Sequence, residues 1–486
     1  MKPGTPGTGR AAGQRGTASL IVVMLLFFVL SLTAAYANRH LIFEQKTSAN
    51  QSRSTAAFEA AEAGIEWALA QLNGSIIDAH CGDHAATTSF QQRYLSFSAT
   101  GVVNQTSRGG NPDDPRIWPT CVFNGTSWNC TCPTGAAADP VAPVGTGPFP
   151  AFRVWLSTPE PSTAAAPPAN AASSPWVAVT PARPGFAFIH SVGCTRLPAA
   201  VEPCLDFLAR GEIGEGVSFQ RTILSLRSGL AVAPAAAVTA RRAVTPAVGP
   251  ARLRVVNTDD RSGGITIHSA DPVDASRFEF QTVPGTPPEL SVVHGDPRLM
   301  AVSTVAPASA PPAPASLSAG ERMFVSTFGM KRATYRQQPG LRVCASPCTA
   351  ADVNTLMQTN PDRVIWVEGD LVVNADIGSV GTPVLMIVDG DTLTMDPDRR
   401  IFGFVYLTGE GAVIPNQSTL RLPDAPTQIQ GALVAEGSLV TEYAGVPAAS
   451  SFMTVTYDRA ALDRLRMTYG SWVRLGAAWR DFKVAP

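Results

Sequence analysis

The sequence has little charge and lacks the common motifs of enzymes. Asp, Glu, Lys and Arg make up 15% of its 486 residues, against roughly 25% in soluble domains. The net charge is -1, so no basic surplus indicates a nucleic-acid partner. No P-loop, nucleophile elbow or H-E-x-x-H motif is present. We therefore predict a protein that is not an enzyme and that binds no cofactor and no nucleic acid.

Glycine, proline and cysteine are plentiful by contrast. Gly and Pro number 41 each, which favours strands, turns and loops over a helical protein. The eight cysteines are even in number and all follow the apolar N-terminal run. In an exported chain this pattern favours disulfides, with free thiols as the alternative. We predict the local pairs Cys194/Cys204 and Cys344/Cys348. The connectivity is otherwise not readable for Cys81, Cys121, Cys130 and Cys132.

The N-terminus joins a basic leader to a long apolar run. Residues 1–16 contain three basic residues and no acid, and residues 17–37 carry no charge. As a helix, the apolar run is roughly 31 Å long, enough to cross a bilayer core. Two interpretations compete. The run is either a secretory signal, cleaved after the A-x-A site that ends at Ala37, or a retained helix, cleaved between Gly16 and Thr17.

Helical signal continues well beyond Ala37. One apolar stripe has i, i+3, i+4 and i+7 spacing, and an acidic strip runs beside it. No proline interrupts residues 17–73, and Asn73-Gly74 is a helix stop. A discarded signal has no need of this continuity, so we favour one retained helix of roughly 55 residues. The stripe consists of Phe58, Ala61, Ile65, Ala68, Leu69 and Leu72, and the strip of Glu59, Glu62 and Glu66.

Two segments carry a family resemblance. The first is the leader end Gln14-Arg15-Gly16 with the following Thr17-Ala18-Ser19-Leu20-Ile21, and the second is Phe58-Glu59-Ala60-Ala61-Glu62-Ala63-Gly64. Together they resemble the N-terminal region of PilX-type minor pilins of type IV pili, over about residues 14–72. The resemblance implies that a prepilin peptidase cuts after Gly16 and that Thr17 becomes an N-methylated N-terminus. It also places Ile21, Phe58, Glu59, Glu62 and Gly64 on the helix that packs in the filament.

Ile21 departs from the pattern of most pilins, which carry glutamate at the fifth mature position. That glutamate is thought to neutralise the N-terminal amine of a neighbour. A lone buried carboxylate costs several kcal/mol unless it is paired, so Ile21 removes a penalty as well as a contact. PilX-like proteins also tend to lack the glutamate. The departure therefore favours an initiating or tip subunit over a major pilin.

The rest of the chain reads as β-rich. Strand patterns at 152–156, 176–179, 186–191 and 217–226 predict an antiparallel pilin-like sheet, and Pro/Ala stretches at 157–175 and 233–250 predict linkers or loops. Four later strand-Gly-strand units place their glycines at positions 369, 390, 409 and 437. This irregular repeat predicts a parallel β-solenoid, with an ordinary β-sandwich as the alternative.

Candidate sites for chemistry are few. His80-Cys81-Gly82-Asp83-His84 offers metal-ligand residue types, but a second matching pair is missing, so we predict a disulfide loop and no metal site. The acids Asp370, Asp389, Asp391 and Glu410 could line one side of a solenoid, as in carbohydrate-active β-helix enzymes. They stand beside turn glycines, where solvated acids are common, so we predict no catalytic residues.

These patterns together predict an α+β protein. Its predicted parts are a leader (1–16), a transmembrane helix (17–38), an amphipathic helix (39–73), a pilin-like β domain with insertions (74–230), a solenoid (231–456) and a C-terminal segment (457–486). In that last segment we predict a short helix with Leu462 and Leu465 on one face, and aromatic residues such as Trp472 that cap the solenoid, with docking of a partner as the alternative.

The predicted function is that of a minor pilin-like subunit at the initiating or tip position. It would cross the inner membrane once, with its bulk in the periplasm, and reach the cell surface after assembly. Its expected partners are other minor pilins, a tip adhesin, prepilin peptidase and the inner membrane. The alternatives are a secreted β-solenoid protein that acts on or binds carbohydrate, and a membrane-anchored binding protein that never polymerises.

Overall fold

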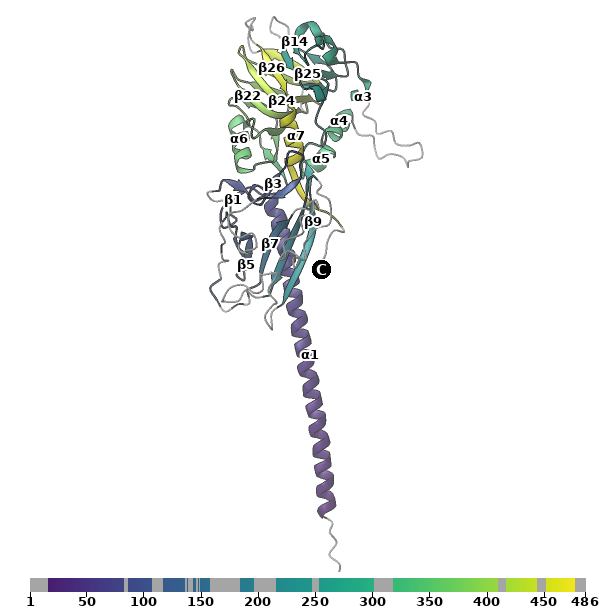
Figure 1. Ribbon diagram of the computed structural model, residues 1–486, viewed down its shortest axis with the longest axis vertical. Helices are drawn as coiled ribbons and strands as arrows, with labels where there is room; N and C mark the ends of the chain where they lie inside the picture. The colour runs from purple at the N-terminus through teal and green to yellow at the C-terminus, as the bar shows by residue number, and fades with distance from the viewer. Residues whose placement is uncertain are drawn as a thin grey trace, which may run out of the picture.

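The computed structural model places one long helix, a head and an upper domain along a single axis (Figure 1). The head combines the end of the helix with an antiparallel sheet, and the upper domain is built on parallel sheets. The described residues are 16–82, 86–106, 117–135, 138, 143–145, 147, 149–157, 184–195, 216–246, 253–300, 318–409, 417–443 and 452–476.

Helix α1 spans Gly16–Leu72, 57 residues, or roughly 85 Å at 1.5 Å per residue. The prediction of one continuous helix is confirmed. The helix stops at the predicted place, because Asn73 turns back onto the last turn. Its side-chain Nδ2 donates to the Leu69 carbonyl at 3.0 Å and its backbone N–H to the Ala70 carbonyl at 3.2 Å.

Six antiparallel strands form the head sheet, which packs on the upper part of α1. The predicted strands near 152, 186 and 217 are present, whereas 176–179 lies outside the described residues. Strand β3, which pairs with β4 in a hairpin, lies at the top of the head (Figure 1), and a small helix, α2, directly precedes it. In order across the sheet the strands are β27 Gly470–Arg474, β9 Val217–Ser228, β8 Phe186–Cys194, β7 Ala151–Ser157, β5 Thr120–Phe123 and β6 Trp128–Thr131. These three elements are α2 Phe90–Tyr94, β3 Leu95–Phe97 and β4 Val103–Gln105.

Strand β27 belongs to the head although it follows the upper domain in sequence. It pairs with β9, with Gly470 opposite Ser228 and Arg474 opposite Leu224. Trp472 is 1% exposed within the head core. The prediction that Trp472 caps the parallel domain is therefore wrong, because pairing with β9 returns the chain to the head.

The upper domain, residues 229–469, is thus inserted between β9 and β27. From β16 to β25 the chain alternates between two sheets, and each described pairing within them is parallel. The first sheet contains β16 Leu341–Cys344, β18 Val364–Glu368, β20 Val384–Asp389, β22 Arg400–Leu407, β24 Thr427–Ala435, β26 Met453–Tyr457, β12 Leu253–Val256 and β14 Phe278–Gln281, with β10 Val238–Ala240, β13 Ile267–Ser269 and β15 Val292–Val293 beside it. The second contains β17 Cys348–Thr349, β19 Leu371–Val373, β21 Thr392–Met395, β23 Gln417–Leu422, β25 Ser438–Tyr443 and β11 Val244–Thr245.

The four strand-Gly-strand units occupy consecutive places in these two sheets. Val367 lies opposite Val388, which lies opposite Leu407 in the next strand. Their side chains stack in the core between the sheets. The turn glycines also stack, since a Cβ on Gly390 would lie 2.4 Å from the carbonyl carbon of Gly369. Like residues thus recur at like positions, which accounts for the repeat in the sequence.

Helices cover the outer face of the first sheet. Phe324 packs on the outward row that contains Trp366 and Tyr406, while Leu462 and Leu465 of the predicted C-terminal helix are fully buried in the same cluster. The prediction of that short helix is confirmed. The covering helices are α4 Ala319–Phe328, α5 Arg332–Tyr335 and α7 Arg459–Thr468, and α6 Ala350–Thr359 packs beside β16 and β17.

The Ala-rich stretch 233–250 differs from its prediction. It was expected to be a linker or loop, yet β10 pairs in parallel with β24, and β11 with β25. Ala237 and Val238 are fully buried. Small apolar side chains let this segment pack closely as strands of the two sheets. A linker can have the same Ala-rich composition, so composition alone does not distinguish the two. The other predicted linker, 157–175, lies outside the described residues apart from Ser157.

Candidate functional site: the helix and its contact with the head

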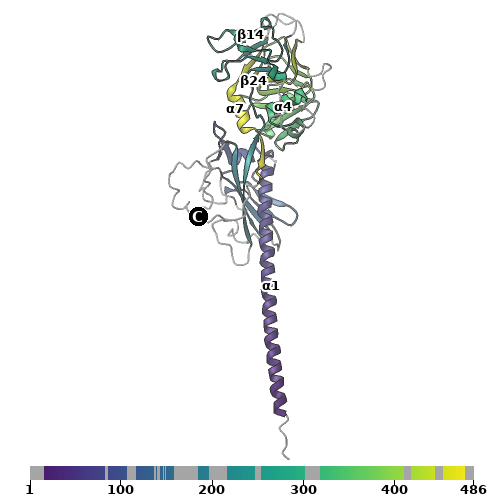
Figure 2. The ribbon, with the colours of Figure 1, turned by 90° about the vertical axis from the view of Figure 1, so that its right-hand side faces the viewer.

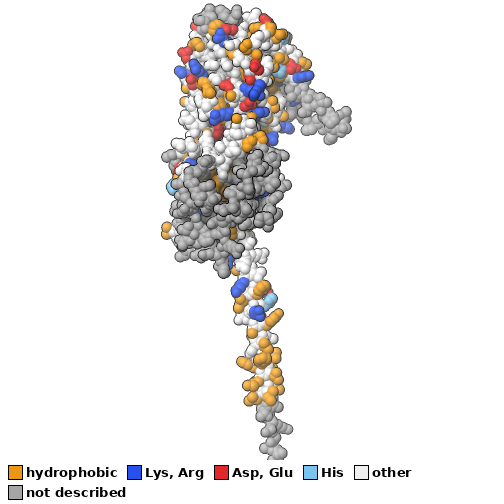
Figure 3. Space-filling view, in the orientation of Figure 1, with side chains coloured by type: hydrophobic (Ala, Val, Ile, Leu, Met, Phe, Trp, Pro, Cys, Tyr) orange, Lys and Arg blue, Asp and Glu red, His pale blue; other side chains and the backbone are white. Residues whose placement is uncertain are grey.

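The lower half of α1 carries an uncovered apolar surface (Figure 3). From Leu20 to Phe43 its large apolar side chains are about half exposed or more, and among the described residues this helix has a stretch long and apolar enough to cross a membrane. Thr33 donates its hydroxyl to the Val29 and Leu30 carbonyls at 3.0 and 2.9 Å, so its polar group needs no water. The segment fits a membrane anchor.

The upper half of α1 meets the sheet through alanines and aliphatic residues. Ala57, Ala61, Ile65, Ala68 and Leu72 are fully buried. The predicted stripe is thus confirmed for most of its members, but Phe58 is wrongly included, because its side chain is 36% exposed. The close approach of helix and sheet leaves room for the Ala57 methyl group but not for a ring, so Ala57 begins the stripe in place of Phe58.

Two glycines set the distance between helix and sheet. A Cβ on Gly64 would lie 2.3 Å from the Ser191 Oγ on β8. A Cβ on Gly193, also on β8, would lie 2.3 Å from both the Ala57 carbonyl oxygen and the Ala61 nitrogen. Contacts that short do not occur. At Gly193 they are made with helix backbone that cannot rotate away, so this position requires glycine at this spacing, whereas at Gly64 the Ser191 and Phe152 side chains would have to shift. Gln220 on β9 adds a hydrogen bond across the seam, from its Nε2 to the Phe58 carbonyl at 3.1 Å.

The acidic strip beside the seam has a basic partner from the far end of the chain. Arg474 on β27 donates to Glu62 at 2.8 Å and to Glu66 at 3.0 Å, while Glu59 is exposed. Partial burial alone would lower the pKa of Arg474, yet the two carboxylates raise it. Sequence reasoning missed Arg474, since nothing local marks a residue that reaches α1 only through strand pairing.

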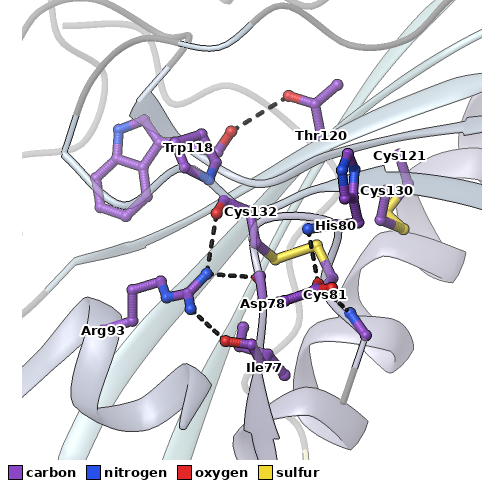
Figure 4. The surroundings of a disulfide bond; sticks show 12 residues. Ile77, Asp78, His80, Cys81, Arg93, Trp118, Thr120, Cys121, Cys130 and Cys132 are labelled. Atoms are coloured by element: carbon purple, nitrogen blue, oxygen red, sulfur yellow. Dashed lines mark hydrogen bonds between the residues drawn. A yellow bond between two sulfur atoms is a disulfide. The ribbon is translucent and has the colours of Figure 1, made fainter. Parts of the chain in front are cut away.

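Two disulfides fasten one edge of the head (Figure 4). Cys81 bonds to Cys132 and Cys121 to Cys130. Nearby, Arg93 donates to the Asp78 and Cys132 carbonyls at 2.7 and 2.9 Å. The predicted pair Cys344/Cys348 is confirmed in the upper domain. Cys194 is disulfide-bonded, and its predicted partner Cys204 lies outside the described residues.

The predicted candidates for chemistry serve local structure. The Asp78 carboxylate accepts the His80 backbone N–H at 2.8 Å, and no group of ligand residues within the described ranges could hold a metal ion. Asp370 accepts the backbone N–H groups of Asp391 and Thr392 from the next turn, at 3.1 and 2.9 Å. Glu410, like His84, lies outside the described residues.

One polar cleft of 540 Å³ lies beside α4 and α5. Its most buried acid, Glu436, is held by Arg332 at 2.5 Å and by the Tyr406 hydroxyl at 3.0 Å. Burial raises the pKa of Glu436, although Arg332 acts in the opposite direction. The acid therefore serves to tie α5 to β22 and β24.

Comparison with known proteins points to helix α1, the same part of the chain that the geometry singles out. Residues 15–66 match the family model of the PilX N-terminal region, so this part of the chain is type IV pilin-like. A solved structure with similarity is the competence-associated pilin ComZ from Thermus thermophilus, at 11% identity, covering 88% of this chain and 97% of that one. Its TM-score is 0.20, too low to compare the two folds. The curated proteins contain no significant match.

Proposed function

We propose that this protein is a minor pilin-like structural subunit that initiates or ends a type IV pilus or pseudopilus and displays its upper domain there. The observation that carries the proposal is the PilX-type segment at 15–66. This segment lies on α1, whose N-terminal half is exposed and whose C-terminal half packs against the head sheet. A bare apolar helix needs a partner, first lipid and then the helices of neighbouring subunits.

The position of the upper domain supports an end position in the filament. The domain lies beyond the C-terminal end of α1, in line with the helix, in both views (Figures 1 and 2). A subunit stacked further along the same axis would meet this bulk, whereas subunits added from the membrane side would not. Isoleucine in place of glutamate at position 21 fits this order, because a first subunit has no earlier subunit whose N-terminal amine it would neutralise.

The remaining parts of the proposal follow from the anchor. Prepilin peptidase would cut between Gly16 and Thr17, with the basic leader on the cytoplasmic side of the inner membrane and the bulk in the periplasm until assembly. Other minor pilins and a tip adhesin would be the partners. The in-register parallel ladders support a β-solenoid in residues 231–456, which is a rigid and extended body suited to display.

Gene deletion followed by complementation tests the function. Deletion should strongly reduce the number of surface pili, and the full-length gene should restore it. An epitope inserted beside the exposed Leu290 should then be labelled by immunogold at pilus ends. Label along the whole filament would contradict the end position, and unchanged piliation after deletion would contradict a role in assembly.

A further inference from the structure

The junction between α1 and the upper domain contains a clamp of two arginines. The carbonyl groups in the last turn of a helix have no partner within the helix and carry its negative dipole end. Here Arg363 donates to the Leu72 carbonyl, and Arg342 donates to the Asn73 carbonyl at 2.6 Å. Both arginines belong to the upper domain: Arg363 immediately precedes β18, and Arg342 lies within β16.

Arg363 also holds the returning strand. Its other terminal nitrogen donates to the carbonyl of Gly470, the first residue of β27, at 3.1 Å. The side chain is 1% exposed. Burial lowers the pKa of Arg363 to about 10, so it remains charged at neutral pH. One buried cation therefore joins the helix end, the upper domain and the head sheet, and carbonyl dipoles offset much of its desolvation.

The chain leaves and re-enters the head at the same point. Ser228 lies opposite Gly470, and the Gly229 N–H donates to the Tyr469 carbonyl at 2.8 Å. Space at this point is minimal, since a Cβ on Gly340 would lie 2.3 Å from the Gly470 carbonyl oxygen. Asn73 completes the junction by donating to the Trp472 carbonyl at 2.9 Å and accepting its N–H at 2.8 Å.

We propose that Arg363, assisted by Arg342, locks the upper domain in line with α1, so that helix, head and upper domain move as one stiff rod. A hinge of two chain crossings without such a clamp would let the domain swing. The consequence, that load on the displayed domain passes directly into the filament helix, rests on the proposed function. The stiffness itself does not, and it is measured on the isolated protein.

Double electron–electron resonance on the full chain in detergent micelles tests the clamp. Spin labels on non-canonical amino acids at Gln51 and Leu290, both exposed, report the angle between helix and upper domain. A second pair, at Gln51 and Asn129, reports the integrity of the head. Such labels avoid introduced thiols, which could exchange with the disulfides that the described part of the chain contains.

The wild-type protein should give one narrow distance between Gln51 and Leu290. Arg363→Met should at least double the width of that distribution while leaving the head pair unchanged, and Arg363→Lys, which can reach one carbonyl at a time, should fall between them. Arg336→Met is the matched control, because Arg336 makes an exposed ion pair with Glu368 at 2.6 Å in the same domain. A broad wild-type distribution, or an Arg363→Met distribution as narrow as wild type, would overturn the clamp. If Arg363→Met also broadens the Gln51–Asn129 distance distribution, the Gln51–Leu290 distribution of Arg363→Lys decides the test. A distribution for Arg363→Lys that is no wider than that of the wild type would then reject the proposal.

Discussion

In the head, antiparallel strands pack on one helix, whereas in the upper domain successive parallel strands of similar pattern pack on one another. The head depends on contacts that occur once, such as Gly193 against the α1 backbone, and on disulfides that link distant segments. The upper domain depends on a contact that recurs from strand to strand. We therefore expect a single substitution to destabilise the whole head, but to destabilise the upper domain only near the substituted residue.

The strongest test of this contrast is Gly193→Val. The new side chain would meet the backbone of Ala57 and Ala61, which cannot rotate away, so we expect a loss of about 3 kcal/mol or more in the stability of the head. Urea denaturation followed by Trp fluorescence measures it. Gly381→Ala is the control, because its nearest neighbour is the Ser379 Oγ at 3.9 Å. Equal stability of the two variants would refute the tight seam.

Removal of disulfides compares the two regions directly. Loop-closure entropy predicts a loss of about 4 kcal/mol for Cys81→Ser with Cys132→Ser, whose sequence separation is 51, and about 2 kcal/mol for Cys344→Ser with Cys348→Ser, separation 4. Denaturant midpoints of the two double variants give the order. A reversed order would mean that the head does not rely on its long-range link.

A core truncation in the upper domain should act locally. Leu420 is fully buried between the sheets, and Leu420→Ala should cost about 2–5 kcal/mol. Hydrogen exchange followed by mass spectrometry should show faster exchange in β21, β23 and β25, with β7 and β8 unchanged. Faster exchange throughout the head would show that the two regions unfold together.

Mild acid should weaken the head in particular. Burial, with Arg221 nearby, lowers the pKa of His190 well below its usual value. In mild acid, His190 therefore becomes protonated in the unfolded chain but stays neutral in the folded head. Stability should therefore fall by up to about 1.4 kcal/mol per pH unit below about pH 6.5, until the folded pKa is reached. His190→Gln should remove this slope between pH 6.5 and 5 in thermal unfolding, and an unaltered slope would assign it to other groups.

The smallest effect is expected at the acidic strip. Arg474→Met removes ion pairs to Glu62 and Glu66 that are partly exposed, so the loss should be below about 1 kcal/mol and should shrink at high salt. Thermal unfolding at low and high ionic strength measures both. A salt-independent loss would indicate packing and not charge as the contribution of Arg474.

Local patterns sufficed for part of this structure. The continuous helix, its stop at Asn73, the repeat glycines and the Cys344–Cys348 pair each depend on residues that are close in sequence, and each was predicted. The place of Trp472 could not be predicted, because strand β27 returns across the whole upper domain to pair with β9.

The seam and the junction show the same limit. Helical spacing located the buried stripe but could not show that it begins at Ala57 and not at Phe58, which depends on the close contact of Gly193 with the helix backbone. Arg363 lies within the inserted upper domain and Arg474 follows that domain in sequence, yet both reach α1. No periodicity marks such residues, since a buried or paired arginine looks like any solvated one in the sequence.

The mature N-terminus tests the central claim most directly. Mass spectrometry of the protein purified from its native membrane should show a chain that begins at Thr17, with the helix Gly16–Leu72 otherwise intact. A chain that begins at Asn38 would instead show removal of the apolar run as a secretory signal, and would contradict the pilin-like anchor.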